Sequence, residues 1–292
     1  MRVALLGFGL IGGSIARALR RDSGDWRIAA WSPSGDGPRA ARIQGVLHEA
    51  SPSPRDAIEG ADLIVLAGPP LATLALIDDM GRGGLAASVA PDALVTDVAS
   101  TKETIGQRAD EAGLRFVGGH PMAGRELTGF DASAADLFDG RPWVVVPGAR
   151  ATPDDLARVE ALAVACGAIP ARMTAREHDA TVAGISHLPL VVATALVEAV
   201  AGAGDGPNRP DWPIAASLAA SGWQGMTRLA RGDEEMGAGI MATNGPAIAA
   251  RLRDLRTALD GWLRELERDG GPDAESLNAR LTAARRRLEE EA

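Results

Sequence analysis

The sequence predicts an α/β protein in which an open sheet domain, residues 1–174, is followed by an all-helical domain, residues 175–292. Two observations carry this prediction. Up to Met173, short apolar runs alternate with helical patterns, which is typical of βαβ units and a parallel sheet. After Met173 the strand signal ends and long helical segments dominate, so the chain is expected to change from a sheet to a bundle there.

The elements of the first domain follow one another in a regular order. Strands are predicted at Val3–Leu6, Arg27–Trp31, Asp62–Ala67, Ala93–Asp97, Arg115–Gly118, Trp143–Val146 and Ile169–Met173. Helices are predicted at Gly12–Arg21, Leu71–Met80 and Lys102–Ala112, and from Thr152 to about Cys166. The last helix has a strong start signal, because Thr152 is a good N-cap and Pro153 fits the first helical position.

The second domain is predicted to be a bundle that needs a partner. Its helices are expected at Arg176–Ala201, Trp212–Arg231, Glu234–Thr243, Pro246–Arg268 and Ala274–Glu290. The first of these is apolar around most of its circumference, and such a helix must be buried on all sides. A small bundle buries it poorly alone, so the sequence predicts a homodimer.

The composition excludes several classes of protein. A net charge of −9 argues against general binding to nucleic acid or to an anionic membrane, so an anionic substrate needs a local cationic site. Cys166 is the only cysteine, which excludes an internal disulfide. No apolar run approaches the ~20 residues needed to span a bilayer, and the first strand leads directly into Gly7 rather than into a signal-peptide pattern. We therefore expect a cytoplasmic protein.

Residues 7–12 read G-F-G-L-I-G, the spacing of a dinucleotide fingerprint, between a predicted strand and a predicted helix. Gly7 is expected to allow the tight turn, Gly9 to let a pyrophosphate approach the backbone, and Gly12 to let the helix pack on the sheet. The phosphates would lie at the helix N-terminus. The first domain is therefore predicted to be Rossmann-like and to bind NAD or NADP. The candidate cofactor-binding residues in this turn are Gly7, Gly9, Leu10, Ile11 and Gly12.

The end of the second strand bears on the choice of cofactor. An acidic residue about 20 residues after the fingerprint usually holds the ribose of NAD. Here Ser32 occupies that position, and Asp36 follows within a Gly/Pro loop. Without an acid to repel it, the 2′-phosphate of NADP could be accepted by Ser32, Ser34 and Arg39. Alternatively, Asp36 folds back onto the ribose and the cofactor is NAD; the serine slightly favours NADP.

The most informative stretch is 118–126, which reads G-G-H-P-M-A-G-R-E. His120 follows a predicted strand, so we expect it at the carboxyl end of the sheet, where ligands bind in open α/β folds. The flanking glycines and proline constrain the loop, which is how a catalytic side chain is held, and we interpret His120 as catalytic. Glu126 is interpreted as orienting His120 or the substrate, or as an exposed loop carboxylate. Ser100 follows another strand and is expected to cap the next helix or to point into the same crevice.

Two further motifs lie in the helical domain. Ser186–Pro189 interrupts a long apolar helix, where the proline predicts a kink or break. His187 in this motif is expected to face the domain cleft or a buried hydrogen bond. His178 is half a turn out of phase with His187 on a straight helix, so the two cannot ligate one metal, and no metal site is predicted. Thr227-Arg228 lies in an apolar stretch, where an arginine forms a structural pair or binds an anion bidentately.

Taken together, these motifs resemble the prephenate/arogenate (cyclohexadienyl) dehydrogenase family of tyrosine biosynthesis. The matching pieces occur in the family's order and cover nearly the whole chain. They are Gly9–Ser14, Asp97–Lys102, Gly119–Glu126, Leu137-Phe138 with Trp143, His178-Asp179, Ser186–Pro189, and Thr227-Arg228 followed by Asn244. The His-Pro-Met-Ala-Gly and Ser-His-Leu-Pro pieces are specific, whereas the glycine fingerprint is not.

The resemblance implies a Rossmann-like domain, a helical domain that dimerises, and NAD(P)-dependent oxidative decarboxylation of prephenate or arogenate. In that reaction a hydride leaves C4 of the ring for the nicotinamide, the ring carboxylate leaves as CO₂, and the ring becomes aromatic. The resemblance implies that His120 is the base on the C4 hydroxyl, which suits a side chain that titrates near neutral pH. It also implies that Arg228, beside Thr227, pairs with a substrate carboxylate. The other residues that it places at or near the site are Ser100, Glu126 and His187.

The chain departs from the family pattern around the substrate and dimer regions. Trp223–Gly225 stands where Phe-Arg-Asp is frequent, Leu190 where a second histidine is frequent, and Met236-Gly237 where Met-Trp is frequent. These differences leave open a pyruvyl or an alanyl side chain on the substrate, and also an amino-substituted cyclohexadiene. A second hypothesis is a β-hydroxyacid dehydrogenase or imine reductase, which the lack of lysine in the helical half disfavours. A third is a non-catalytic dinucleotide-sensing protein.

Overall fold

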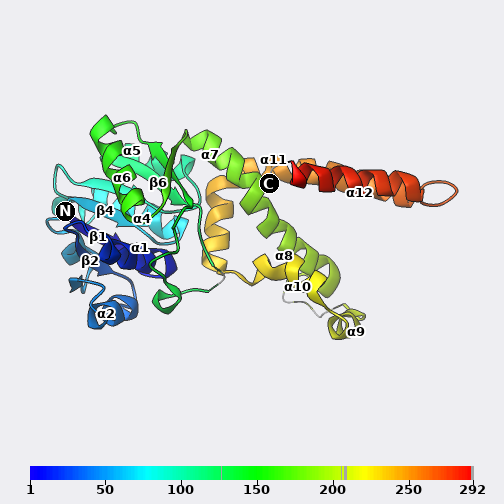
Figure 1. Cartoon of the computed structure of the whole chain (residues 1–292), viewed down its shortest axis with the longest axis horizontal. Coiled ribbons are helices and arrows are strands. Elements are labelled where there is room, and N and C mark those ends of the chain that lie inside the picture. The colour runs from blue at the N-terminus through cyan, green and yellow to red at the C-terminus, as the bar shows by residue number, and fades with distance from the viewer. Residues whose placement is uncertain (126, 205, 207–208, 291–292) are drawn as a thin grey trace.

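The computed structural model describes residues 1–125, 127–204, 206 and 209–290. Figure 1 shows a sheet flanked by helices and, beside it, an elongated helical part that ends in a projecting helical hairpin. Every strand ends at or before Arg172, and the described residues beyond it form helices and connecting segments. The predicted succession of an open α/β domain and an all-helical domain is therefore confirmed.

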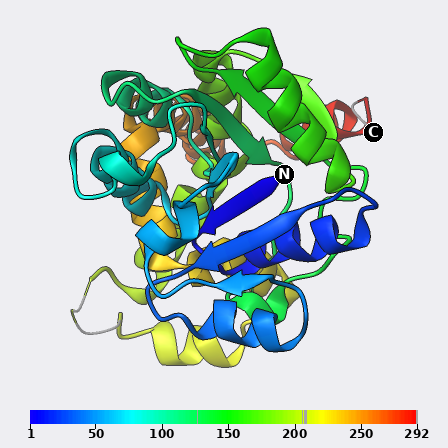
Figure 2. The same ribbon diagram turned by 90° about the vertical axis from the view of Figure 1, so that its left-hand side faces the viewer.

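Eight strands form one sheet. They are β1 (Arg2–Leu6), β2 (Arg27–Trp31), β3 (Glu49–Ala50), β4 (Leu63–Leu66), β5 (Leu94–Asp97), β6 (Phe116–Pro121), β7 (Pro142–Pro147) and β8 (Ile169–Arg172). Their spatial order is β3-β2-β1-β4-β5-β6-β7-β8, and Figure 2 shows the twist of the sheet. β1 pairs in parallel with β2 on one side and with β4 on the other. The strand order therefore reverses beside β1, and ligands bind at the carboxyl ends of such a switch point.

The sheet differs from the predicted parallel arrangement at one pair. β7 is antiparallel to β6, whereas β8 is parallel to β7. No crossover helix lies between β6 and β7 in the described residues, which hold only the short 3₁₀ helix η2 (Phe130–Ala132) there. An antiparallel neighbour needs no crossover helix, so the chain can return directly along the edge of the sheet.

Helices cover both faces of the sheet (Figure 2). They are α1 (Leu10–Arg21), α2 (Asp36–Ile43), α3 (Pro54–Ile58), α4 (Pro70–Arg82), η1 (Ala86–Ser88), α5 (Glu103–Glu111) and α6 (Pro153–Ala165). The sequence analysis missed α2, α3 and β3, because these elements are too short to show a period. The start signal at Thr152 is confirmed, since Thr152 and Asp155 form a reciprocal capping box.

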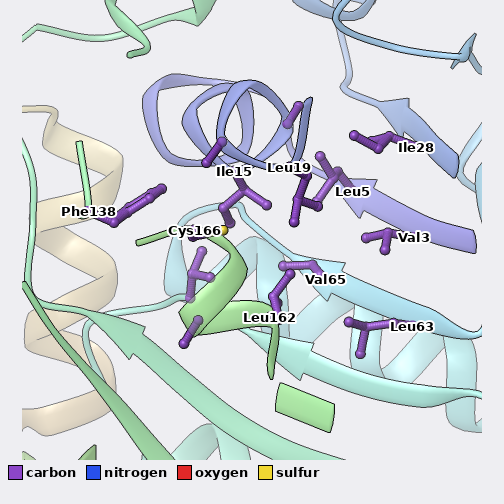
Figure 3. Close-up of a cluster of buried hydrophobic side chains, with 14 of the residues drawn as sticks. Val3, Leu5, Ile15, Leu19, Ile28, Leu63, Val65, Phe138, Leu162 and Cys166 are labelled. Atoms are coloured by element: carbon purple, nitrogen blue, oxygen red, sulfur yellow. The ribbon is translucent and has the colours of Figure 1, made fainter. Parts of the chain in front are cut away.

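Successive side chains of the central strands point to opposite faces of the sheet and pack into two hydrophobic cores. Val3 and Leu5 of β1 point to one face, where they pack with α1 and α6, and Figure 3 shows this cluster with Cys166 inside it. Ala4 and Leu6 point to the other face, toward the side chains of α4 and α5. Since both faces are buried, these strands read as continuous apolar runs, which made them visible in the sequence.

The helical domain is built from segments that the sequence predicted only in part. They are α7 (Ala175–Val182), the π-helical turn η3 (Ala183–His187), α8 (Leu188–Ala201), α9 (Trp212–Ser217), α10 (Ser221–Thr227), the 3₁₀ helix η4 (Arg228–Arg231), α11 (Glu234–Leu266) and α12 (Ala274–Glu289). The single helix predicted over Trp212–Arg231 is wrong, because the backbone is extended at Ala220 (φ −115°, ψ −165°). The break predicted between Glu234–Thr243 and Pro246–Arg268 is confirmed: α11 consists of two helical parts that meet at a kink with non-helical backbone at Asn244 (φ −129°, ψ 22°), because Pro246 disrupts the preceding turn.

The run Ala175–Ala201 is more apolar than the sequence analysis allowed. It has 27 residues and a mean hydropathy of 1.8 in its most apolar window, of which 22% is buried, so it could cross a membrane by length and composition. The expectation that no apolar run approaches this length is therefore wrong. Two of its side chains, His178 and Asp179, are 1% and 2% exposed in the protein interior. Most of this apolar segment, including α8, is not buried within one chain, so we expect it to pack against another surface.

We expect that surface to belong to a second copy of the chain. Other large apolar side chains of the same domain are also exposed, such as Ile185 (67%), Ile214 (69%) and Leu218 (77%). Because apolar surface of this extent favours association, light scattering at low micromolar concentration should give about twice the 30.1 kDa of one chain. A stable mass near 30.1 kDa would contradict the dimer.

Candidate functional site

The glycine turn after β1 has the geometry that a bound pyrophosphate requires. Gly7 has a φ of 98°, which favours glycine, and a Cβ on Gly12 would lie 2.4 Å from the Gly7 carbonyl oxygen. A Cβ on Gly9 would meet no atom within 4 Å, so the backbone is open on that side. Leu10 begins α1, and Ile11 follows it, both partly buried. The turn therefore fits a dinucleotide with its phosphates at the start of α1.

The loop after β2 holds the candidate residues for cofactor choice. Ser32 is partly buried directly after β2, and Ser34 is exposed. Asp36 begins α2 rather than folding back on the strand, and Arg39 donates to its carboxylate at 2.5 Å and to the Ser34 carbonyl at 3.3 Å. The guanidinium thus lies over the loop that the ribose of a dinucleotide would face.

A buried ion pair supports the carboxyl end of β5. Asp97 and Lys102, the only lysine of the chain, are 0% and 1% exposed, and their side chains form a salt bridge. Asp97 also accepts from Gly119 N at 3.1 Å and from Ala99 N at 3.0 Å. Burial raises the pKa of Asp97 and lowers that of Lys102, and the pairing opposes both shifts. This pair fixes the backbone of β6 one residue before His120.

His120 lies within β6, whereas the sequence analysis expects it just after the strand. The register pairs Thr96 of β5 with Val117, so His120 extends past the end of β5. Burial, and then electrostatic interactions with His178, Lys102 and His187, lower the pKa of His120 well below 6.5. The lowered pKa favours a neutral His120 imidazole at pH 7, at the carboxyl edge of the sheet.

His178 and Asp179 connect His120 to the helical domain. His120 Nδ1 lies 2.8 Å from His178 Nε2, and His178 Nδ1 lies 2.7 Å from Asp179 Oδ1. Asp179 accepts from the backbone N–H groups of Lys102 and Glu103, at 2.8 and 2.9 Å, and so caps α5. The expectation that Ser100 caps this helix is wrong, because α5 begins three residues later under Asp179.

The π-helical turn η3 brings His187 close to His178 and His120. A π turn holds one more residue than an α turn, which shifts the phase between His178 and His187 by roughly 100°. The expectation that they lie half a turn apart is therefore wrong for this helix. Burial, the largest cause, and an electrostatic interaction with His178 lower the pKa of His187 to about 4, and Asp179 opposes this shift. Within the described residues no group of three or more potential ligands could hold a metal.

Asn244 orients His187 from the kink of α11. Its Nδ2 donates to the Asp179 carbonyl at 2.9 Å and lies 3.1 Å from His187 Nδ1. His187 Nδ1 therefore accepts, and Nε2 carries the hydrogen. That Nε2 is buried and has no hydrogen-bond partner in the described part of the chain, so it is a donor suited to a ligand. The Ser100 backbone lies against the same ring and raises the pKa of His187.

The remaining candidates have different outcomes. Glu126 lies outside the described residues. Ser100 is half-buried beside His187. Thr227 is 3% exposed and donates to the Trp223 carbonyl at 2.8 Å, so its hydroxyl serves the helix. Arg228 begins η4, which packs against α8, and its binding role remains a prediction.

The sequence analysis assigned no role to four residues that structure the site. They are Asp97, Lys102, Asp179 and Asn244. Asp97 ends a mostly apolar buried strand, which is a signal that could have identified it, whereas Lys102 and Asp179 lie in polar stretches that give no such signal. The contact between His178 and His120 could not be expected from the sequence, because the two residues are 58 positions apart.

Comparisons with known proteins agree over both domains. The family model "Prephenate dehydrogenase, nucleotide-binding domain" matches residues 15–170, and "Prephenate dehydrogenase, dimerization domain" matches residues 174–282. The chain is 29% identical to the prephenate dehydrogenase of Bacillus subtilis over 91% of this chain and 68% of that protein. It is 30% identical to the cyclohexadienyl dehydrogenase of Zymomonas mobilis over 88% of each. The crystal structure of Synechocystis arogenate dehydrogenase matches 99% of this chain and 100% of that one, with a TM-score of 0.77 and 30% identity.

Proposed function

Since the chain belongs to the prephenate dehydrogenase family, we propose that it oxidises and decarboxylates prephenate or arogenate with His120 as the base. It is a nicotinamide-dependent dehydrogenase of tyrosine biosynthesis and contains the family's dimerisation domain. One observation carries the assignment of the base. His120 lies past the carboxyl end of β5, and its contact with His178 uses only Nδ1, which leaves Nε2 for a substrate hydroxyl.

The side chains account for the proton and for the orientation of the ring. His120 Nε2 takes the hydroxyl proton as the C4 carbinol becomes a carbonyl. When bound, the nicotinamide supplies the hydride acceptor. His187 Nε2–H and the Ser100 hydroxyl are available as donors to the ring substituents. Arg228 is assigned to a substrate carboxylate, because a guanidinium binds a carboxylate through two parallel hydrogen bonds. When the ring carboxylate leaves as CO₂, the electron pair of the broken C–C bond enters the ring and reaches the C4 oxygen, which takes the proton back from His120 to give a phenol.

The side chain of the substrate is the least constrained part of this proposal. Leu190 is partly buried, and a Cβ on Gly237 would lie 3.6 Å from its Cδ2, so α8 and α11 meet through an apolar contact there. This contact offers no polar group to separate a pyruvyl from an alanyl substituent. The ring and its carboxylates, which prephenate and arogenate share, therefore carry the recognition that we assign.

An absorbance assay of the reduced cofactor tests the reaction directly. Prephenate and arogenate should each be tried with NAD and with NADP, and at least one pair should give turnover with release of CO₂. A dinucleotide-sensing protein without activity would bind cofactor in a fluorescence titration yet reduce none with either substrate. A β-hydroxyacid dehydrogenase would reduce cofactor only with a β-hydroxyacid. We place the enzyme in the cytoplasm.

For the cofactor we propose that NADP is accepted at least as well as NAD. Ser32 provides no negative charge at the end of β2, and Arg39 is the cation over the following loop. Arg39→Ala should raise the KM for NADP roughly 10- to 100-fold, the worth of a hydrogen bond to a charged group, and should leave the KM for NAD nearly unchanged. Arg42→Ala, on the same helix, is the matched control. Equal effects of Arg39→Ala on both cofactors would show that the guanidinium does not contact the 2′-phosphate.

A further inference from the structure

His120 is the end of a chain of three side chains that crosses between the domains. His120 contacts His178, and His178 contacts Asp179, at 2.8 and 2.7 Å. Neither His178 nor Asp179 has a part in the reaction steps given above. We propose that they are positioning residues, which hold His120 in the one tautomer that can accept the substrate proton. This inference rests on the proposed function of His120 as the base.

The hydrogen positions follow from the chemistry of the partners. A carboxylate can only accept, so the hydrogen between Asp179 Oδ1 and His178 lies on His178 Nδ1. A neutral imidazole carries a single hydrogen, so His178 Nε2 is an acceptor. The contact to His120 must then be donated by His120 Nδ1–H. The lone pair of His120 is thereby left on Nε2, the atom that meets the hydroxyl.

Asp179 is held in place by the other domain. Its two oxygens accept from Lys102 N at 2.8 Å and from Glu103 N at 2.9 Å, at the N-terminus of α5. The positive end of a helix dipole and two backbone donors both favour the carboxylate form. Because the Asp179 carboxylate can only accept, His178 must donate to it, and His120 must donate to His178. When His120 takes the substrate proton on Nε2, its Nδ1–H still donates to His178. No proton has to move from His120 through His178 to Asp179.

The tautomers can be observed without any turnover. The chain has only four histidines, so long-range ¹H–¹⁵N spectra of the protein labelled with ¹⁵N-histidine should be assignable with single variants. We expect His120 and His178 as Nδ1–H tautomers and His187 as the Nε2–H tautomer. Finding neutral His120 as the Nε2–H tautomer, or His178 protonated on both nitrogens at pH 7.5, would overturn the proposal.

Replacing Asp179 with asparagine should reverse the direction of the hydrogen bonds that join residue 179, His178 and His120. An amide Nδ2 turned toward His178 can donate to Nδ1 while the amide oxygen still accepts from Glu103 N; because Nδ2 replaces the oxygen that also accepts from Lys102 N, that one bond is lost. His178 would then carry its hydrogen on Nε2 and donate to His120, whose own hydrogen moves to Nε2. We expect the His120 signals to switch to the Nε2–H tautomer. kcat should fall roughly 10- to 100-fold, which is the worth of the charge-assisted hydrogen bond between Asp179 and His178 that the variant lacks. The KM values for substrate and cofactor should change little. A fall in kcat with unchanged tautomers would overturn the proposal.

Two variants of His178 separate hydrogen bonding from packing. His178→Gln keeps an acceptor oxygen near the position of Nε2, so it should retain most of kcat and the Nδ1–H tautomer of His120. His178→Leu fills similar space without an acceptor and should lose both. Equal kcat values for the two variants would show that His178 acts only through packing.

The control addresses the contact between the domains. Thr101 Oγ1 lies 2.8 Å from Thr243 Oγ1, which also donates to the Gly239 carbonyl at 2.7 Å. Thr101→Val removes this cross-domain bond and leaves the three side chains intact, so kcat and the tautomers should stay near normal. If Asp179→Asn switches the His120 tautomer while kcat is unchanged, the positioning is right and the assignment of His120 as base is wrong.

Discussion

Replacing His120 with asparagine is expected to reduce kcat by roughly 10²–10⁴-fold, the usual worth of general base catalysis. Asparagine can place an amide near the position of Nδ1 and keep the bond to His178, so the fold of the site should persist. Cofactor affinity should hardly change, because the glycine turn is untouched. Steady-state kinetics with the better substrate and a cofactor titration measure both effects.

His48→Asn provides the matched control for this substitution. His48 is exposed, and its Nδ1 accepts from Ile28 N at 3.0 Å, far from β6 in the strand order of the sheet. The control variant should turn over normally. Near-normal turnover in His120→Asn as well would remove His120 from the mechanism.

The pH dependence of kcat/KM tests the same group independently. Only neutral His120 can take a proton, and the protonated form is inactive. Because burial lowers the pKa of His120 well below 6.5, the neutral form persists as the pH falls from 8 through 6.5. The acid limb of the kcat/KM profile, which reports groups of the free enzyme, should therefore begin below pH 6.5 and disappear in His120→Asn. An acid limb centred at or above 6.5 would contradict the lowered pKa.

Replacing Arg228 with alanine is expected to raise the KM for the substrate sharply. Removing one partner of a charged, hydrogen-bonded pair that is desolvated on binding costs about 2–5 kcal/mol, which corresponds to a rise of roughly 30-fold or more. kcat should change less, because the carboxylate is distant from the atom that loses its hydride. Arg228→Lys should rescue poorly, since an ammonium lacks the planar fork of a guanidinium.

Arg231→Ala is the control for Arg228, because both residues lie in η4. It should leave the KM for the substrate unchanged. If Arg228→Ala binds the substrate as tightly as the unchanged protein does, the carboxylate partner must be sought elsewhere in the chain.

Features that depend on neighbouring residues along the chain could be predicted from the amino-acid sequence. The buried strands are continuous apolar runs, the turn after β1 requires glycine at Gly7, and the start of α6 is set by Thr152 and Asp155. Each of these signals acts over a few residues, through backbone freedom, capping or side-chain period. The same local signals placed His120 at the carboxyl edge of the sheet.

The surroundings of His120, in contrast, depend on how the two domains pack. Its partner His178 is 58 residues away in sequence, and Asp179 caps a helix that begins more than 70 residues earlier. The π turn at Ala183–His187 changes the angle between the side chains before and after it, and the spacing of apolar residues in the sequence does not predict this turn. Hydrogen bonds between distant segments exist only once both domains are packed, so the direction of the bonds that hold His120 is a property of the fold and not of its motif.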